Sequence, residues 1–385
     1  MQSCVARGGK AAAWALMDTA NFMNTTTTEH PIPPGQPLPH RKVLREWLIP
    51  LSERTTFYAL VLLVLDLAIW AALLAGTVLF EAWWAKLLCG LAAGFVIGRL
   101  FIIGHDACHQ SLTPHRGLNK WLGRIAFLPS LTPYSLWDVG HNVVHHGYTN
   151  LKGFDFVWAP LTQAEYEALT PMDRLLDRVY RSGWAPGLYY MVEIWWNRMF
   201  FPNPRHMPTR RSIFVRDNLL VSAFGLVWIG AMTAAALAFD QSVALVLLMG
   251  VVVPFLFWCA MIGFVVYVHH THVKVSWHDD RSAWSKAQPF VSTTVHLTFP
   301  FKIGALMHHI MEHTAHHVDM SIPLYKLSQA QDKLETMLPE RIIVQPFSWR
   351  WYFETARQCK LYDFTRRCWT DYAGRATSEP TPLPA

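Results

Sequence analysis

The segments Gly104-His105-Asp106-Ala107-Cys108-His109 and His141-Asn142-Val143-Val144-His145-His146 carry histidines at the spacing of helix turns. A third cluster, His313-Thr314-Ala315-His316-His317, lies far along the chain. On a helix, residues i, i+3 and i+4 share one face, with Cβ atoms about 5–6 Å apart. The residues predicted to point the same way are His105 with His109, His141 with His145, and His313 with His316 and His317. The adjacent His146 is expected to reach a neighbouring site.

This clustering predicts a metal site. Imidazole is a ligand for zinc, copper, iron and nickel. Because one zinc ion takes about four ligands, a set of eight histidines indicates two metal ions. The eight candidate ligands are His105, His109, His141, His145, His146, His313, His316 and His317. The alternative is that these histidines fill unrelated polar sites, which does not explain three clusters with helical spacing.

The composition indicates a membrane protein. Of the 385 residues, 52% are hydrophobic and only 16% are charged, whereas soluble domains carry about 25% charged residues. The predicted spans are Thr55–Phe80, Trp83–Ile103, Asn218–Phe239 and Val243–Tyr267. About twenty apolar residues cross a hydrocarbon core of roughly 30 Å. We therefore expect an all-α integral membrane protein, with four transmembrane helices in two hairpins and a cytoplasmic helical cap that carries the histidines.

The distribution of basic residues predicts the orientation. The turns near Glu81 and Asp240 lack Lys and Arg, whereas the N-terminal segment and the long central segment are rich in both. By the positive-inside rule, both termini and all three histidine clusters are expected on the cytoplasmic side. The net charge of +6 suits an anionic membrane surface. No basic domain stands apart, so a nucleic-acid partner is not expected.

The chain divides into three parts on composition. Residues 1–50 are expected to form a flexible cytoplasmic tail, residues 51–330 the membrane domain with its cap, and residues 331–385 a C-terminal cytoplasmic tail that is disordered from Ala376. Thr170-Pro171-Met172-Asp173 has the features of a helix start. This helix and Gly187–Phe201 are predicted to lie in the membrane interface, or else in a soluble helical layer.

A few polar residues stand out inside the predicted spans. Asp66 lies in the middle of the first span, where charged residues often mark function; the alternative is a buried, hydrogen-bonded structural carboxyl. Arg99 is expected to extend toward the lipid headgroups. The six cysteines form no CxxC pair, and no disulfide is expected on a cytoplasmic face. Cys108 is interpreted as a packing residue.

These residues carry a family resemblance. His105-x3-His109, His141-x3-His145-His146 and His313-x2-His316-His317, with two hairpins around them, resemble the membrane fatty acid desaturase superfamily. The three-residue gap in the first motif is similar to the acyl-lipid, omega-6/delta-12-like branch. Gly153-x-Asp155-x2-Trp158-x-Pro160 and His270-Thr271-His272 are further matches. The resemblance covers roughly residues 57–327.

The resemblance implies a chemistry. Members hold two non-haem iron ions that activate O2 and desaturate an acyl chain, here expected in a membrane lipid. Two electrons come from a ferredoxin-like or cytochrome b5-like donor, which is expected to be a separate protein because no His-Pro-Gly-Gly haem motif occurs. The resemblance also implies a ninth ligand at the end of the fourth span, with His270 preferred over His272, and His269 as a bystander.

Two carboxylates are candidates to orient the ligands. A metal-bound histidine usually donates its second ring N–H to a carboxylate or a carbonyl. Asp106 directly follows His105, and Asp155 follows the second cluster in a loop that can fold back. We expect at least one of these two to accept such a hydrogen bond. The alternative for Asp106 is a helix cap or a solvent-facing residue.

Other functions remain open on the sequence. A hydroxylase or ketolase of the same superfamily would use the same histidines. A membrane cytochrome would place histidine pairs within the bilayer, whereas these clusters lie at or beyond the ends of the spans. A zinc peptidase would carry HExxH, which is absent. A transporter would need charged groups near the mid-membrane, and only Asp66 fits.

Overall fold

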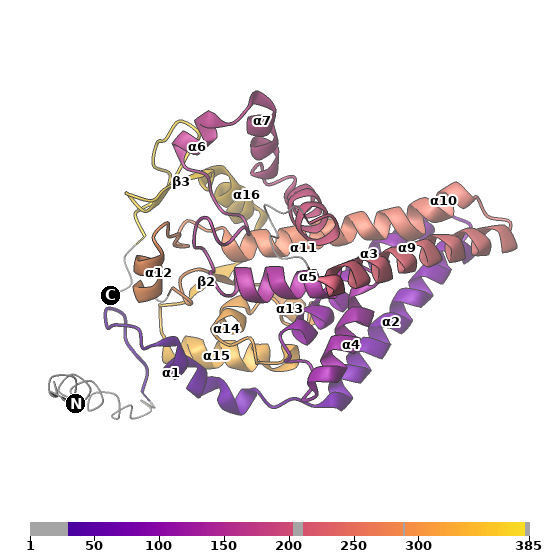
Figure 1. The fold of residues 1–385 in the computed structure, drawn as a ribbon, viewed down its shortest axis with the longest axis horizontal. Coiled ribbons are helices and arrows are strands. Elements are labelled where there is room, and N and C mark those ends of the chain that lie inside the picture. The colour runs from indigo at the N-terminus through magenta and orange to yellow at the C-terminus, as the bar shows by residue number, and fades with distance from the viewer. Residues whose placement is uncertain (1–29, 203–210, 288, 382–385) are drawn as a thin grey trace, which may run out of the picture.

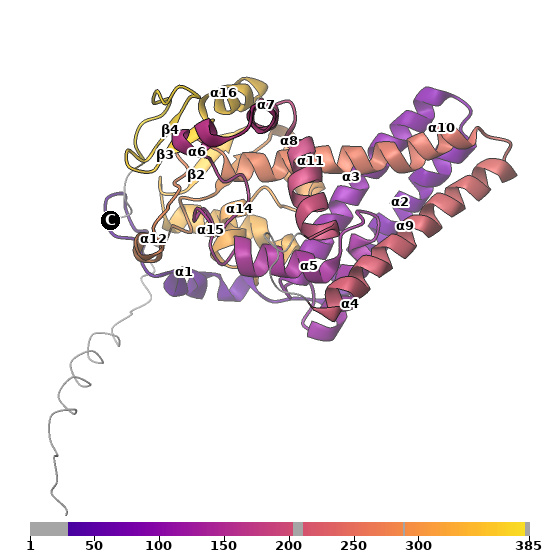
Figure 2. The ribbon, with the colours of Figure 1, turned by 45° about the horizontal axis from the view of Figure 1, so that its top comes forward.

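The fold is mostly helical, with the apolar helices on one side and shorter elements on the other (Figures 1 and 2). The computed structural model describes residues 30–202, 211–287 and 289–381. Two small two-stranded sheets are also present, so the prediction of an all-α protein was wrong in this detail. One sheet pairs the segment 295–298 with residues 343–346, and the other forms within the C-terminal segment.

Four helices in the described residues have the length and composition to cross a membrane. They are α2 (Thr56–Leu79), α3 (Trp83–Cys108), α9 (Ser212–Ala238) and a continuous helix made of α10 (Val243–Leu247), the π-helical η4 (Leu248–Val252) and α11 (Val253–His270). Helices α3 and α11 extend beyond the predicted ends at Ile103 and Tyr267. Their extensions carry candidate ligands, so the apolar helices themselves position part of the site.

Helix α3 lies at the centre and packs against α2, α11 and α4 (Arg116–Phe127). Three glycines four residues apart, Gly90, Gly94 and Gly98, face η4 and α11. A Cβ atom added at Gly94 would lie 2.7 Å from the carbonyl oxygen of Pro254, and one added at Gly98 would lie 2.6 Å from the sulfur of Met261. Small residues at this spacing let helix backbones approach closely.

The remaining elements cover the inner ends of these helices. The helical elements are α1 (Arg41–Leu48), η1 (Ile49–Leu51), α5 (Tyr134–Asp138), η2 (Val139–His145), α6 (Gln163–Ala168), α7 (Pro171–Tyr180), α8 (Pro186–Tyr189), η3 (Tyr190–Phe200), α12 (Arg281–Ala287), η5 (Pro300–Lys302), α13 (Ile303–Leu306), α14 (His313–Val318), η6 (Leu324–Lys326), α15 (Leu327–Met337) and α16 (Trp349–Gln358). The predicted start of α7 is confirmed, because the Thr170 hydroxyl accepts a hydrogen bond from the Asp173 N–H.

The first pair of strands joins the segment before the third histidine cluster to the C-terminal segment. Strand β1 (Val295–Thr298) pairs in parallel with β2 (Ile343–Pro346), and β3 (Leu361–Asp363) pairs antiparallel with β4 (Cys368–Thr370). The prediction of disorder from Ala376 was wrong. The Thr377 N–H donates to the Trp369 carbonyl, and the Thr381 N–H donates to the Arg367 carbonyl. The C-terminal segment therefore packs onto the cap through residue 381.

The N-terminal segment is also part of the fold where it is described. Leu44 and Leu48 of α1 are buried against α15 and its neighbours. The predicted flexible tail thus contains a packed helix. Residues 1–29, which make up most of that predicted tail, lie outside the described residues.

Asp66 is the buried, hydrogen-bonded carboxyl that the sequence allowed as an alternative. Its side chain is fully buried and forms an ion pair with Arg99, with Nε and Nη2 at 3.0 and 2.9 Å from Oδ1. The Nε2 atom of His308 lies 2.9 Å from Oδ2. Arg99 does not extend toward headgroups as predicted, because this carboxylate is a nearer partner. The three residues tie α2, α3 and the loop before α14 together.

Replacing Asp66 by Asn should destabilise the protein. The change leaves Arg99 without its counter-charge, and breaking a buried ion pair costs about 3–5 kcal/mol. Thermal unfolding of the detergent-purified protein measures the effect. Glu354→Gln is the matched control, because Glu354 is half exposed in a surface pair with Arg350 that is worth about 0–1 kcal/mol. Equal melting temperatures for the two variants would contradict a structural role for Asp66.

Candidate metal centre

Two groups of histidines meet at the inner ends of α3 and α11. Within each group, one nitrogen of every ring lies within 4.8 Å of those of the others. The first group is His105, His109, His141, His146 and His316; the second is His145, His270, His313 and His317. Nine of the ten histidines predicted as ligands fall in these groups, and His272 falls in neither.

The second histidine motif lies on a π-helical turn. In η2 the His146 N–H donates to the His141 carbonyl at 2.9 Å, an i→i+5 bond that brings these two residues onto one face. The rings of His141 and His145, predicted to point the same way, do stack, with centroids 5.4 Å apart, but they contribute to different groups. His141 and His146 belong to the first group, and His145 belongs to the second. The wider turn splits the adjacent pair between the two groups.

The third motif is divided in the same manner. On α14, His313 and His317 are four residues apart and join the second group, whereas His316 joins the first. The three rings lie side by side as predicted, with centroids 4.6 to 5.7 Å apart, but they contribute to both groups. The two groups touch, because the rings of His146 and His317 stack with centroids 4.1 Å apart. Two motifs thus supply nitrogen atoms to both groups.

The donor set fits two metal ions. Nε2 atoms face one another at short distances: 2.8 Å for His141 and His105, 3.1 Å for His316 and His146, and 3.0 Å for His270 and His313. A neutral imidazole has one N–H and one lone pair, so nitrogens that converge in this way cannot all pair with one another. Ligand nitrogens about 2.1 Å from one ion and at right angles would lie about 3.0 Å apart.

The protonation state also suits a metal. Burial, followed by repulsion among neighbouring imidazoles, holds the pKa of several rings well below the ordinary value for histidine: His141, His146, His313, His316 and His317. These side chains are therefore neutral near pH 7. Neutral imidazole is the form that binds metal.

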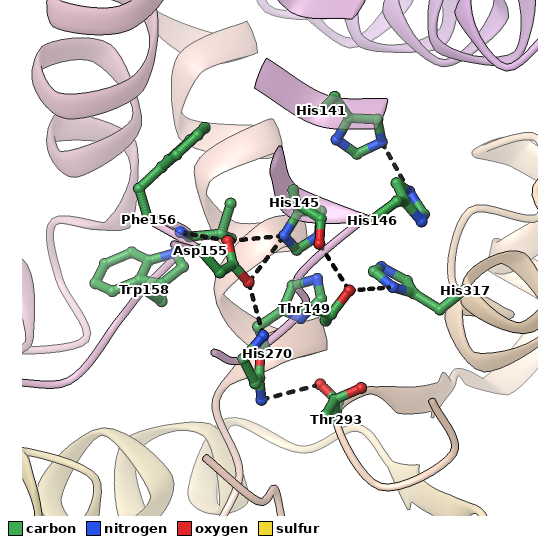
Figure 3. A network of polar contacts seen from close by, with 12 residues as sticks. His141, His145, His146, Thr149, Asp155, Phe156, Trp158, His270, Thr293 and His317 are labelled. Atoms are coloured by element: carbon green, nitrogen blue, oxygen red, sulfur yellow. Dashed lines mark hydrogen bonds and ion pairs between the residues drawn. The ribbon is translucent and has the colours of Figure 1, made fainter. Parts of the chain in front are cut away.

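Asp155 fixes the ring of His145 (Figure 3). Its buried carboxylate lies 3.0 and 3.1 Å from His145 Nδ1 and accepts backbone N–H bonds from Asn150 and Val157. The ring must donate from Nδ1, which leaves the Nε2 lone pair directed to the second group. Asp106 differs: its nearest oxygen is 3.7 Å from His105 Nδ1, and its other oxygen accepts the Leu324 N–H at 2.6 Å.

Thr149 plays the same part for His317, and sequence reasoning missed it. The Thr149 hydroxyl donates to the His145 carbonyl at 2.8 Å, so it must accept from His317 Nδ1 at 3.2 Å. The second group therefore has two of its rings held as Nδ1–H tautomers (Figure 3). The position four residues after His145 is the signal that could have indicated Thr149.

The three histidines at the end of α11 have different roles. His270 belongs to the second group. His272 is hydrogen bonded elsewhere: its Nδ1 accepts the Lys274 N–H at 3.0 Å and its Nε2 faces the Gln345 amide oxygen at 3.3 Å. His269 stacks on His313 with ring centroids 3.9 Å apart and lies outside both groups.

An apolar cavity opens next to both groups. It lies between α3, η3 and α11, and five of the grouped histidines form one end of it. Its apolar lining includes Phe101, Trp137, Tyr190, Ile194, Met199, Ile262 and Val265. A long hydrocarbon chain is the kind of ligand that such a lining accepts.

Asp155→Asn should lower metal retention without abolishing it. The amide no longer carries the charge that holds the His145 Nδ1 proton, and such losses cost about 10–100-fold in metal affinity or activity. The measurement is bound metal per protein in purified samples. His145→Ala should lose more. Asp106→Asn is the matched control, since Asp106 makes no short contact with a histidine; equal metal in the Asp155→Asn and Asp106→Asn variants would contradict this role.

The comparisons with known proteins agree with this site. Residues 81–349 match the family model described as fatty acid desaturase. An sn-1 oleoyl-lipid 12-desaturase of Picosynechococcus is 28% identical over 73% of this chain and 78% of its own length. An sn-1 acyl-lipid omega-3 desaturase (ferredoxin) of Synechocystis is 28% identical over 77% and 80%. A chloroplastic omega-6 fatty acid desaturase of Glycine max is 26% identical over 73% and 63%.

Proposed function

Because this chain belongs to the fatty acid desaturase family, we propose that it uses O2 to place a double bond in an acyl chain of a membrane lipid. Two neighbouring methylene groups each lose one hydrogen. O2 takes up four electrons, two from the acyl chain and two from a redox protein, and with two further protons it leaves as two waters. The apolar cavity that ends at the two histidine groups is the observation that carries this proposal.

The nine grouped histidines are the proposed ligands of two iron ions. When bound, iron would supply the redox chemistry that activates O2. The chain's own contribution is to direct the Nε2 lone pairs of these rings toward one another. Asp155 and Thr149 hold the Nδ1 protons of His145 and His317. Buried packing keeps water away from these atoms, since His145, His270 and His317 are nearly inaccessible to solvent.

The cavity supports the substrate class. Its walls are aromatic and aliphatic, and two of the helices that line it, α3 and α11, are long enough to cross a bilayer. An acyl chain of a lipid could thus pass between α3, η3 and α11 without crossing water. The relatives named as acting on oleoyl-lipid and acyl-lipid support the same assignment.

The proposed setting is a membrane, with α2–α3 and α9–α11 as two hairpins. The turns at their outer ends lack Lys and Arg, so the positive-inside rule puts both termini and the histidines in the cytoplasm. A reporter fused after Ala385 should be active only on the cytoplasmic side. Reporter activity on the opposite side would contradict this orientation.

A separate ferredoxin-like or cytochrome b5-like protein is the proposed source of electrons. The Synechocystis relative carries ferredoxin in its name, which supports a donor of that kind.

Expression in a host that lacks the product should change its lipid acyl chains. Gas chromatography with mass spectrometry of total lipid acyl chains should show a new unsaturated species, with a mass 2 Da lower than its precursor, in cells that express the wild type. Cells that express His145→Ala at an equal level in the membrane should lack it. A hydroxylated or keto product in place of the alkene would instead favour a hydroxylase or ketolase.

Ile262→Trp should block acyl binding while the iron stays bound. Ile262 is buried on α11 and lines the cavity, so an indole ring there occupies space that the acyl chain needs. We expect product to fall at least about tenfold, because overpacking also costs roughly 1–3 kcal/mol. Leu226→Trp on the exposed face of α9 is the control. Normal turnover in Ile262→Trp would argue against this cavity as the substrate site.

A further inference from the structure

A hydrogen-bonded route joins His317 to the edge of the cap. The Nδ1 of His317 meets the Thr149 hydroxyl at 3.2 Å, and the Thr149 carbonyl accepts the indole Nε1–H of Trp284 at 2.9 Å. Thr149 is thus the single residue between a candidate ligand and a tryptophan on α12. Continuous covalent and hydrogen-bonded links couple two redox groups better than a gap of the same length. The route therefore suits the passage of electrons.

The other end of this route lies just beneath the surface. Trp284 is 9% exposed, while its helix neighbours Arg281 and Lys286 are exposed. The indole lies between two aromatic rings, with centroids 6.0 Å from Tyr148 and 6.1 Å from Phe290. Figures 1 and 2 place α12 at the end of the molecule opposite the connection between α9 and α10. In the proposed topology this end faces the cytoplasm.

Helix α1 extends the same surface. The Arg41 guanidinium lies over the Phe290 ring at 4.3 Å and donates to the His317 carbonyl at 2.7 Å. The charged residues of α1 and of the segment 279–287 are Arg41, Lys42, Arg45, Glu46, Asp279, Asp280, Arg281 and Lys286, five basic and three acidic, a net charge of +2. Asp280 is partly used in capping α12, because its carboxylate accepts the Ala283 N–H. The segment 279–287 is itself neutral, with two basic and two acidic residues, and Arg45 is paired with Asp319. The net positive charge of this surface therefore comes from α1, and the exposed cations beside Trp284 are Arg281 and Lys286.

From these contacts we infer that the α1–α12 surface docks a small acidic one-electron carrier protein, and that electrons pass from it through Trp284 and Thr149 to His317. The inference rests on the proposed function, which requires two electrons per double bond. A one-electron carrier therefore docks twice in each cycle and is oxidised by one electron each time. Two electrons then reach His317, where bound iron would accept them. Basic residues at the rim speed such encounters, and salt weakens them.

The test compares two sources of electrons for the same iron-loaded, detergent-purified enzyme. One source is a reduced acidic [2Fe–2S] ferredoxin, and the other is dithionite with methyl viologen, which needs no docking surface. Trp284→Phe keeps a ring but removes the indole N–H. We expect ferredoxin-driven reduction, followed by stopped-flow absorbance, to slow at least tenfold in this variant. Iron content and the rate with dithionite should stay within twofold of the wild type.

Charge reversal tests docking separately from the route. Arg281→Glu with Lys286→Glu should raise the KM for ferredoxin at least fivefold at low salt, with little change in kcat, and should flatten its dependence on ionic strength. Arg350→Glu, at an exposed position on α16, is the matched control. If Trp284→Phe loses iron, the charge-reversed variant still tests the docking surface. Neither the Arg281 nor the Lys286 side chain contacts a histidine in the described residues.

The outcomes separate this inference from the proposed function. Wild-type ferredoxin kinetics in Trp284→Phe and in the charge-reversed variant would overturn the docking surface and leave the desaturase proposal intact. A wild-type enzyme that binds no iron, or makes no alkene with either reductant, would instead refute the proposed function. Slowing by the same factor with ferredoxin and with dithionite would show that Trp284 acts on the site itself, which also overturns the inference.

Discussion

The structure depends on bringing the lone pairs of nine imidazoles into one small volume. Most of these rings are buried, and an unpaired buried polar group costs about 1–3 kcal/mol on mutational scales. The fold therefore has to supply both a partner for each Nε2 and a fixed direction for each ring. Helices α3 and α11, the turn η2 and helix α14 provide the directions. Asp155 and Thr149 provide the tautomers for two rings.

The sequence predicted the site better than its internal arrangement. Histidine spacing identified which residues meet, because any helix-like turn brings residues three to five apart together. It could not divide them between two groups, since the π-helical turn at residues 139–145 has no clear signature in side-chain type. On an α-helix the spacing predicts that His145 shares a site with His141, whereas in the structure His146 is in the same group as His141.

The apolar helices could be predicted from the sequence for a physical reason that does not apply to the cap. A span must be uniformly apolar over about twenty residues, a signal that needs no tertiary context. The C-terminal segment has mixed composition, and its order comes from contacts with distant residues. The Trp369 indole donates to the His272 carbonyl, and β2 forms only by pairing with β1. Asp66 was recognisable as unusual, but its partner His308 lies 242 residues away.

The three glycines on α3 have a consequence for an enzyme whose product alters the lipid that surrounds it. On the proposed function, each turnover makes the surrounding bilayer more fluid and alters its lateral pressure. Gly90, Gly94 and Gly98 let α3 pack directly against η4 and α11. His105 lies in the last turn of α3, and His270 is the last residue of α11. This close contact between the two helices thus fixes the distance between their histidine-bearing ends. The site keeps its dimensions while the lipid around it changes.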